Sequence, residues 1–127
     1  MHTDPISDML TRIRNASKAQ KSVVTMDYSK IKEHILEVMK SKKFIEDVSV
    51  EEEGVRKILK IKLSEKYPHL HLKRVSKPGQ RIYIKTDELK QVKSGLGLTI
   101  LSTPKGVMSN LEARKQHLGG EVLCEIY

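Results

Sequence analysis

The chain has 127 residues and a formal net charge of +8, and 38% of its residues are apolar and 31% are charged. These values are typical of a soluble globular protein of one or two small domains, and the basic excess indicates a polyanionic partner. No apolar run is long enough to span a bilayer, and the start lacks the cationic flank of a signal peptide, so we expect a cytoplasmic protein with no membrane partner.

Cysteine and aromatic residues are scarce in this sequence. The single cysteine, Cys124, cannot form an internal disulfide and lies in an alternating segment, which favours a buried, inert thiol. One Phe, four Tyr and no Trp do not provide an aromatic platform on which unpaired bases could stack. A folded RNA, recognised by its shape and by a few base contacts, therefore fits better.

The chain begins with a predicted helix. Asp4 is a suitable N-cap, and Pro5 suits the first helical position. Apolar residues then recur at helical spacing at Ile6, Met9, Leu10 and Ile13. This periodicity places Arg12 and Arg14 at the flanks of the buried stripe, where a solvated basic face is the default interpretation.

A short strand at residues 22–26 and a second helix follow. Asp27 or Ser29 can cap this helix, in which Lys30 lies in the first turn, where the helix dipole disfavours a cation. A surface position without a functional role explains this lysine slightly better than a contact with a phosphate. The apolar residues of the helix are Ile31, Ile35, Val38 and Met39.

A hairpin and then a domain boundary are predicted next. Residues 44–50 and 55–63 alternate around the acidic turn Glu51-Glu52-Glu53-Gly54. Residues 1–65 hold 13 Lys and Arg against 11 Asp and Glu, whereas residues 66–127 hold 11 against 5. The expected modules are therefore 1–65, with the order α-β-α-β-β, and 66–127, which carries most of the net positive charge.

The second module starts with two predicted strands. Residues 69–76 and 80–85 are joined by Lys77-Pro78-Gly79, in which proline and glycine are both typical turn residues. A short, capped helical piece around Leu89 follows, and Lys93 lies beyond it.

The residue pattern from Gly95 to Tyr127 predicts a strand, a polar loop, a helix and a closing strand. Leu96–Leu101 alternates as a half-buried strand, and Ser102-Thr103-Pro104-Lys105-Gly106 forms the loop. Ser109 and Glu112 match the S-x-x-E capping box of a helix start. We expect this helix to end at Gly119 and Gly120, because glycine tolerates the positive φ of a C-cap.

These features place hydroxyls, cations and a helix start close together. Ser102, Thr103 and Lys105 lie in the loop, and Arg114 and Lys115 lie on the polar side of the helix. The combination suits phosphate and sugar oxygens, which makes RNA the obvious ligand. An ordinary strand, turn and capped helix explains the residue types equally well.

Three groups of residues carry a family resemblance. They are the run DPISDMLTRIRNA from Asp4 to Ala16, the run Lys73-Arg74-Val75-Ser76-Lys77-Pro78-Gly79 with Arg81 and Tyr83, and Gly95, Gly97, Ser102, Thr103, Gly106, Val107, Met108, Ala113, Arg114, Gly119, Gly120 and Glu121. On these residues the chain resembles, over nearly its whole length, the bacterial form of the eighth protein of the small ribosomal subunit. It departs from the family pattern at Pro104, where serine is usual, at Ser7 and Thr99, where alanine is usual, and at Asn110, where aspartate is usual.

The resemblance implies an α+β fold of two small α/β modules, the C-terminal one mostly antiparallel β with short helices. It implies direct binding of small-subunit (16S) ribosomal RNA, organisation of the central domain during 30S assembly beside neighbouring ribosomal proteins, and in some bacteria repression of the protein's own operon through its messenger RNA. No cofactor or metal is expected. Carried over residue by residue, the RNA-binding residues are Ser102, Thr103, Lys105 and Gly106, supported by Tyr83 and Arg114; Lys115, Lys93, Arg14 and Lys30 are further candidates that rest on charge and position.

Two other classes of function explain part of the sequence. An enzyme acting on RNA or nucleotides could use His69, His71 or His117 with Glu121, but the chain has no phosphate-binding glycine loop, no H-E-x-x-H motif and no nucleophile elbow. His69 and His71 would share a strand face without a third metal ligand nearby. A protein that coats nucleic acid without specificity would use the same charge and leave the hydroxyl-rich loop unexplained.

Overall fold

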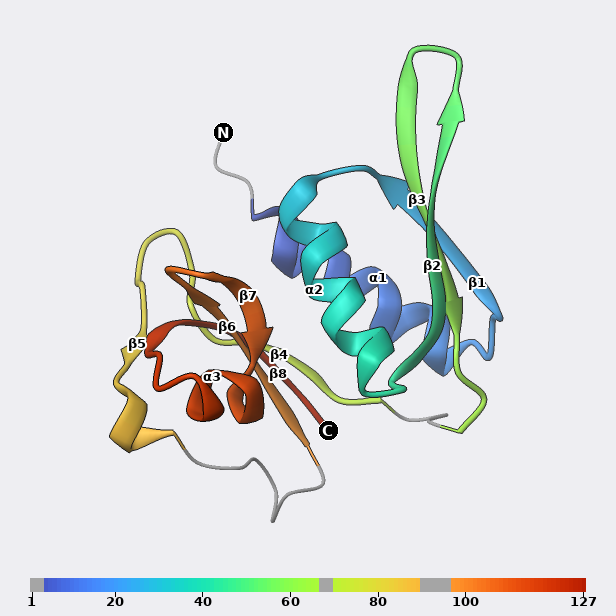
Figure 1. The fold of residues 1–127 in the computed structure, drawn as a ribbon. Helices are drawn as coiled ribbons and strands as arrows, with labels where there is room; N and C mark the ends of the chain where they lie inside the picture. The colour runs from blue at the N-terminus through green and yellow to red at the C-terminus, as the bar shows by residue number, and fades with distance from the viewer. Residues whose placement is uncertain (1–3, 67–69, 90–96) are drawn as a thin grey trace. The chain divides into compact units, whose positions relative to one another are not determined.

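The computed structural model describes residues 4–66, 70–89 and 97–127 (Figure 1). The chain divides into two compact units, Pro5–Leu70 and His71–Tyr127, and Asp4 belongs to the second of them. We term these the N-terminal and C-terminal units. Each combines helices with an antiparallel sheet, which confirms the predicted α+β class. Within the described ranges, no helix has the length and apolar character needed to cross a membrane.

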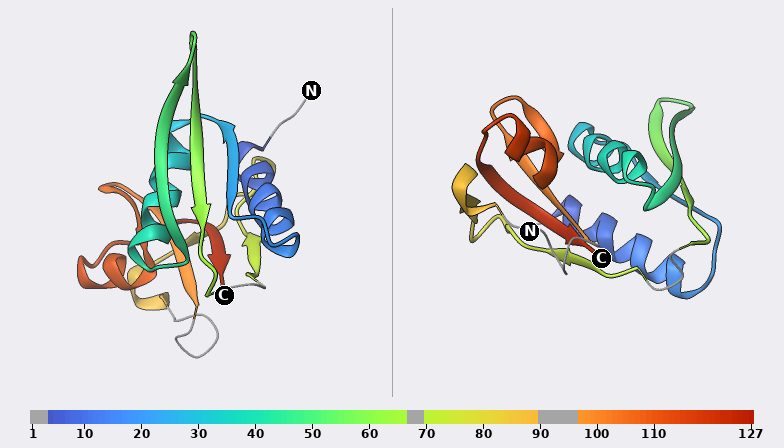
Figure 2. Two further views of the ribbon diagram at one scale, coloured as in Figure 1. Left: turned by 90° about the vertical axis from the view of Figure 1, so that its right-hand side faces the viewer. Right: turned by 60° about the horizontal axis from the view of Figure 1, so that its bottom comes forward.

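The N-terminal unit has the predicted order α-β-α-β-β, with two helices packed on one face of a three-stranded sheet (Figure 1 and Figure 2). The core follows the predicted helical and strand periodicities, and its fully buried side chains include Met9, Leu10, Ile13, Ile35, Leu36, Met39, Leu59 and Ile61. The strand order is β1-β3-β2, and the elements are α1 (Pro5–Lys18), β1 (Val23–Asp27), α2 (Lys30–Ser41), β2 (Ile45–Glu53) and β3 (Arg56–Leu63).

Local sequence signals account for the helix cap and the hairpin of this unit. Ser29 caps α2, because its Oγ accepts a hydrogen bond from the backbone N–H of Lys32 at 3.3 Å. The β2–β3 turn consists of Gly54 and Val55, so the predicted acidic turn is too long and residues 51–53 extend β2 instead. Gly54 has a φ of +64°, as the first residue of a type II′ hairpin turn requires.

The sheet of the C-terminal unit is built around β8 (Gly120–Ile126). Strand β6 (Leu98–Thr103) pairs with one edge of β8 and also with β7 (Gly106–Ser109). Two short strands, β4 (Leu72–Arg74) and β5 (Tyr83–Ile84), pair one after the other with the opposite edge of β8. The strands predicted at residues 69–76, of which His69 lies outside the described residues, and at 80–85 are shorter in the structure, and they are two consecutive pieces of one sheet edge.

One face of this sheet carries a buried apolar cluster. The helix α3 (Asn110–Lys115) packs against β6, β7 and the short 3-10 helix η1 (Thr86–Glu88). Leu89, Leu101, Met108, Ala113 and Val122 form the buried cluster, and Val75, Ile84 and Leu118 pack against it.

Cys124 lies on β8 and is fully buried. Burial raises the pKa of its thiol to about 12, so the group remains protonated at neutral pH. The predicted buried, inert thiol is confirmed.

The C-terminal end of α3 differs from the prediction. The helix ends at Lys115, and the left-handed residue after it is His117, with a φ of +57°, rather than a glycine. The backbone N–H of Leu118 bonds the carbonyl of Ala113 at 2.9 Å, and that of His117 bonds Arg114 at 3.2 Å. These two bonds are the Schellman pattern that satisfies the last carbonyls of a helix.

Gly119 and Gly120 are needed for a different reason, which is the close approach of neighbouring backbones. A Cβ on Gly120 would lie 2.2 Å from the carbonyl oxygen of Ser102, and one on Gly119 would lie 2.5 Å from that of Ile84. Glycine therefore permits the start of β8 to sit between its two partner strands.

Candidate functional site

A row of polar side chains crosses the C-terminal sheet at the start of β8. In the strand register Ser102 on β6 lies opposite Glu121 on β8, and Glu121 lies opposite Tyr83 on β5. Directly opposed residues share a face of the sheet, with Cβ atoms about 4.5–5.5 Å apart. Tyr83 is 71% exposed, and the hydroxyl of half-buried Ser102 makes no hydrogen bond with the described residues. We term these three residues the Ser102–Glu121–Tyr83 row.

The row faces away from α3. Neighbouring residues along a strand point to opposite faces, and the strand neighbours Leu101, Val122 and Ile84 all contribute to the core beside α3. The row therefore lies on the other face of the sheet. Arg114 and Lys115 are exposed on α3 and so belong to the side of the sheet that the row does not face.

Strands β6 and β7 are joined by a two-residue turn, Pro104–Lys105. The loop predicted at residues 102–106 is therefore shorter than expected, because its outer residues are parts of the two strands. Thr103 Oγ1 closes the turn by donating to the carbonyl of Gly106 at 2.8 Å and accepting from the N–H of Lys105 at 3.2 Å. Gly106 has a φ of +122°, a conformation that glycine adopts without strain. The exposed Lys105 ammonium at the tip has no acidic partner among the described residues.

The helix that follows the hairpin starts at the predicted cap. Ser109 Oγ accepts a hydrogen bond from the N–H of Glu112 at 3.2 Å. The second half of the predicted capping box is wrong, since the Glu112 carboxylate accepts from Gln116 Nε2 at 2.8 Å instead. Buried Asn110 accepts a hydrogen bond from the N–H of Thr99 at 3.3 Å, so two positions that depart from the family pattern contact each other.

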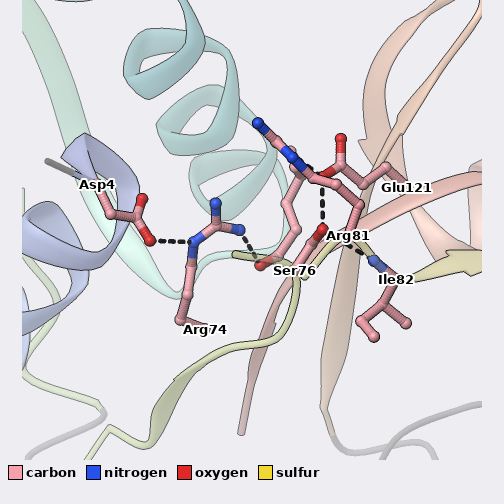
Figure 3. A network of polar contacts seen from close by, with 7 residues as sticks. Asp4, Arg74, Ser76, Arg81, Ile82 and Glu121 are labelled. Carbon is pink, nitrogen blue, oxygen red and sulfur yellow. Dashed lines mark hydrogen bonds and ion pairs between the residues drawn. The ribbon is translucent and has the colours of Figure 1, made fainter. Parts of the chain in front are cut away.

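Glu121, at the centre of the row, is held by a polar network (Figure 3). Its Oε2 accepts hydrogen bonds from Ser76 Oγ and from Arg81 Nη1, the latter at 3.0 Å. Ser76 is fully buried, and its Oγ also accepts from the N–H of Ile82 at 3.0 Å. Burial by itself would raise the pKa of Glu121, but the hydrogen bonds from Ser76 and Arg81 and the nearby guanidinium charges hold that pKa below its ordinary value. The carboxylate is therefore ionised at neutral pH.

Arg74 forms an adjoining anchor in the same unit (Figure 3). Its Nε donates to Asp4 Oδ2 at 3.0 Å, and its Nη1 donates to the carbonyl of Leu123 at 2.7 Å. The side chains of Arg74 and Asp4 are 8% and 17% exposed, and removing one partner of such a buried pair costs about 3–5 kcal/mol. The positive charge of Arg74 also favours the ionised form of Glu121.

A cavity of about 490 Å³ lies in the N-terminal unit. Charged side chains line it in pairs, among them Arg12 with Asp8 and Arg56 with Asp27. In the described ranges no three His, Cys, Asp or Glu side chains are grouped so that they could hold a metal ion. The opposite charges around the cavity largely neutralise one another, so this cavity does not have the features of a site for an anionic substrate.

Comparison with known proteins identifies the family. The sequence profile of the family described as Ribosomal protein S8 matches residues 4–127. The chain belongs to the ribosomal protein S8 family. It is 46% identical to "Small ribosomal subunit protein uS8" of Kosmotoga olearia, and the alignment covers all of both chains. Identity to the proteins of the same name is 49% for Rhodospirillum centenum, with 98% of each chain covered, and 50% for Prochlorococcus marinus, with 98% of this chain and 97% of that protein covered.

Membership of the ribosomal protein S8 family confirms the resemblance drawn from the signature residues. The protein is a ribosomal protein of the small subunit, and it is not an enzyme. The alternative of catalysis through histidines and Glu121 is therefore excluded. In this S8 protein Glu121 instead has an anchoring position in the sheet.

The structure of this S8 protein brings some of the predicted site residues together and separates others. Lys105 and Gly106 lie in the hairpin that begins directly beside the row. Arg14 and Lys30 belong to the N-terminal unit, where Arg14 is half-buried with a polar partner and Lys30 is exposed at the start of α2. Lys93 lies outside the described residues.

Sequence reasoning missed the anchoring of Glu121. Glu121 was identified from the sequence as part of a family signature. The signal that could have pointed to its anchoring role was the presence of a carboxylate in a basic module. Its partner Ser76 is 45 positions away in the sequence, and Arg81 is 40 positions away. Only the pairing of both β4 and β5 with the same edge of β8 brings these three side chains together.

Proposed function

We propose that this S8 protein binds small-subunit (16S) ribosomal RNA directly through the Ser102–Glu121–Tyr83 row and the β6–β7 turn, and that it thereby helps to organise the central domain of that RNA during assembly. The observation that carries the proposal is the row itself, in which a hydroxyl, a carboxylate and a phenol share one sheet face beside a cationic turn. The names of the relatives, which are small ribosomal subunit proteins, support ribosomal RNA as the polyanionic partner.

Each group of this surface suits a different feature of structured RNA. The Ser102 hydroxyl can exchange hydrogen bonds with a ribose 2′-hydroxyl or a base edge, and the exposed Tyr83 ring can stack on an unpaired base. Lys105 suits a phosphate, a contact that positions the protein without reading sequence. Glu121 Oε1, the carboxylate oxygen left over from the network, accepts hydrogen bonds and repels phosphates, so it favours an amino group or a 2′-hydroxyl.

Thr103 acts through the shape of the turn, because both hydrogen bonds of its hydroxyl are made within the hairpin. The other cations extend the contact from positions outside the row. Charge and exposure support such an additional RNA contact for Arg114, Lys115 and Lys30. Charge alone supports it for Arg14 and Lys93.

A titration of the full chain with a fragment of small-subunit ribosomal RNA tests the proposal. Ser102→Ala should weaken binding by about 1 kcal/mol, roughly fivefold, with an unchanged dependence of affinity on salt, because one hydrogen bond is lost and no charge. Ser49→Ala removes an exposed hydroxyl from β2 in the N-terminal unit and is the matched control. If both variants bound the RNA fragment as tightly as the wild type, the Ser102–Glu121–Tyr83 row would not be part of the RNA contact.

Lys105→Ala should behave differently from Ser102→Ala in the same titration. Loss of one phosphate contact weakens binding to specific and unrelated RNA alike, and lowers the magnitude of the salt slope by about 1. An unchanged slope would show that the hairpin tip does not touch a phosphate.

Competition distinguishes specific binding from non-specific coating of nucleic acid. In moderate salt, duplex DNA at equal concentration should leave the complex with the ribosomal RNA fragment largely intact, since the row recognises features that B-form DNA lacks, such as the 2′-hydroxyl. Displacement by the DNA would contradict the proposed specificity.

The same surface would accept a folded segment of the protein's own messenger RNA and so serve translational repression of its operon. A single recognition surface for both RNAs predicts that the messenger segment and the ribosomal RNA fragment exclude each other. Simultaneous binding of both in one complex would contradict this part of the proposal. The surface outside the RNA contact would remain for neighbouring ribosomal proteins.

A further inference from the structure

The edge strand opposite β6 is interrupted by a protruding turn. The N–H of Ser76 bonds the carbonyl of Val122 at 3.0 Å, and the N–H of Val122 bonds the carbonyl of Ile82 at 2.9 Å. Both backbone groups of Val122 are therefore satisfied by residues on either side of the interruption. Residues 77–81 leave the sheet at this position without breaking its hydrogen-bond ladder.

The protruding turn is short and closed. Lys77 and Gln80 exchange two backbone hydrogen bonds, each of 2.9 Å, around the central residues Pro78 and Gly79. Pro78 restricts its own φ, and Gly79 has no positive φ, a combination compatible with a type I turn. We term residues 77–80 the Lys77–Gln80 turn. The backbone of this turn therefore has little freedom to move relative to the residues that precede and follow it.

The base of the turn is tied to the centre of the row. Ser76 precedes the turn and Arg81 follows it, and both donate hydrogen bonds to the same oxygen of Glu121 (Figure 3). The Glu121 carboxylate therefore determines where the turn leaves the sheet relative to Ser102 and Tyr83. A connection that only joined β4 to β5 would not require a buried hydroxyl and an ionised carboxylate at its base.

Two cationic turns flank the row at the same end of the sheet. The β6–β7 turn follows Ser102, and the Lys77–Gln80 turn leaves the opposite edge of the sheet beside Val122, one residue beyond Glu121 on β8. In Figure 1 both turns lie at the upper end of the C-terminal sheet. Strands in a sheet are about 4.8 Å apart, so β5 and β7, the strands beside the two turns, are separated by about 15 Å across the sheet. The Lys77 ammonium, like that of Lys105, is exposed and has no acidic partner in the described ranges.

We propose that the Lys77–Gln80 turn is a second phosphate-contacting arm, placed so that an RNA helix lies across the row with one backbone at Lys105 and the other at Lys77. This inference rests on the proposed binding of ribosomal RNA. The shallow minor groove of an A-form helix displays 2′-hydroxyls and base edges between two phosphate backbones. The row faces the groove, and the two lysines face the backbones on either side.

Lys77→Ala in the full chain tests this arrangement, in titrations with the ribosomal RNA fragment at several salt concentrations. Lys73→Ala is the matched control, because Lys73 is an exposed lysine on the same sheet edge, opposite Glu125 and away from the row. Lys77→Ala should lower the magnitude of the salt slope by about 1 and the affinity about five- to tenfold at 0.1–0.2 M salt, whereas Lys73→Ala should change neither.

The double variant Lys77→Ala, Lys105→Ala decides whether both arms hold the RNA at once. Two simultaneous, independent contacts predict that the fold-changes multiply, to about 25- to 100-fold, and that the slope falls by about 2. A double variant no weaker than Lys105→Ala alone, or a Lys77→Ala variant that matches Lys73→Ala, would overturn the second arm while leaving the proposed function intact. Failure of the wild-type protein to bind the fragment would overturn the proposed function itself.

Discussion

The two sheets of this S8 protein carry their surface charges differently. On the N-terminal sheet and the adjoining α2, lysines lie beside carboxylates, at 3.0 Å for Lys40–Asp47, 3.5 Å for Lys62–Glu46 and 3.7 Å for Lys60–Glu51. On the C-terminal sheet the lysines at the two turns have no acidic partner among the described residues, and the one carboxylate between them is bonded to Ser76 and Arg81. The second surface therefore presents uncompensated positive charge around hydrogen-bonding groups, which suits RNA.

Net charge by itself does not distinguish these two regions. The N-terminal unit holds 14 Lys and Arg against 10 Asp and Glu, and the C-terminal unit with Asp4 holds 10 against 6, so both have a formal charge of +4. The asymmetry counted from residue 66 disappears because Lys66 falls in one unit and Asp4 in the other. The pairing of charges, rather than their total, is what supports RNA binding by the C-terminal sheet.

The largest effect should come from Gly120→Ala, which breaks the sheet beneath the row. The added Cβ would lie 2.2 Å from the Ser102 carbonyl oxygen, so strands β6 and β8 must separate, and we expect a loss of about 3 kcal/mol in the free energy of unfolding. Urea unfolding of the full chain measures this. Gly79→Ala is the control, because an added Cβ there would meet no heavy atom within 4 Å apart from its chain neighbours, and the φ of Gly79 is not positive. Equal midpoints for the two variants would contradict the close backbone approach.

Thr103→Val should have the next largest effect, about 1–2 kcal/mol on unfolding, because the Oγ1 bonds to Gly106 and Lys105 are lost while the shape is kept. Affinity for the RNA fragment should fall together with stability, since the turn presents Lys105. Thermal unfolding and RNA titration on the same sample check both. Wild-type stability with reduced affinity would instead show that the Thr103 hydroxyl bonds the RNA.

Glu121→Gln should show the contribution of the ionised carboxylate through its pH dependence. The pKa of Glu121 is lowered in the folded protein from an ordinary value of 4.5, so the carboxylate stabilises the fold above that pH, and this stabilisation is lost as the pH falls through the lower, folded pKa. At neutral pH the variant should lose about 1 kcal/mol, because the amide oxygen still accepts a hydrogen bond. Its stability should also fall less steeply in acid than that of the wild type.

Glu125→Gln, on the same strand and outside the network of Figure 3, is the control for Glu121→Gln. Urea unfolding from pH 3 to pH 7 compares the three proteins. If the acid dependence of Glu121→Gln matched that of the wild type, the network would not be a source of acid-sensitive stability.

The smallest effect should come from Lys60→Ala on the N-terminal sheet. The Lys60–Glu51 pair is about half exposed on both sides, and such pairs contribute about 0–1 kcal/mol. We expect a change in unfolding free energy of about 0.5 kcal/mol or less, and RNA affinity and salt slope equal to those of the wild type. A fall in slope like that of Lys105→Ala would extend the RNA contact to the N-terminal sheet and remove the contrast between the two sheets.

Much of the fold could be predicted because its signals are local. The periodicity of apolar residues predicted α1, α2 and the β2–β3 hairpin in their correct order. Ser109 was identified as a cap and Ser29 as one of two candidate caps, because the partner of each cap lies only three residues away. The end of α3 was predicted wrongly, since a glycine pair suggested a C-cap where His117 takes the left-handed conformation. The same glycines satisfy a constraint between strands that a local pattern does not reveal.

The sequence by itself determined the elements, the cationic turn residues and the hydroxyls, because hydrogen bonds and side-chain periodicity within a few residues specify them. The tertiary structure decided which of these groups share a surface. A shift of one residue in the register of β6 or β5 would turn Ser102 or Tyr83 to the face that α3 covers. That register depends on the burial of Leu101, Val122 and Ile84 in one core, and so on packing between strands that are distant in the chain.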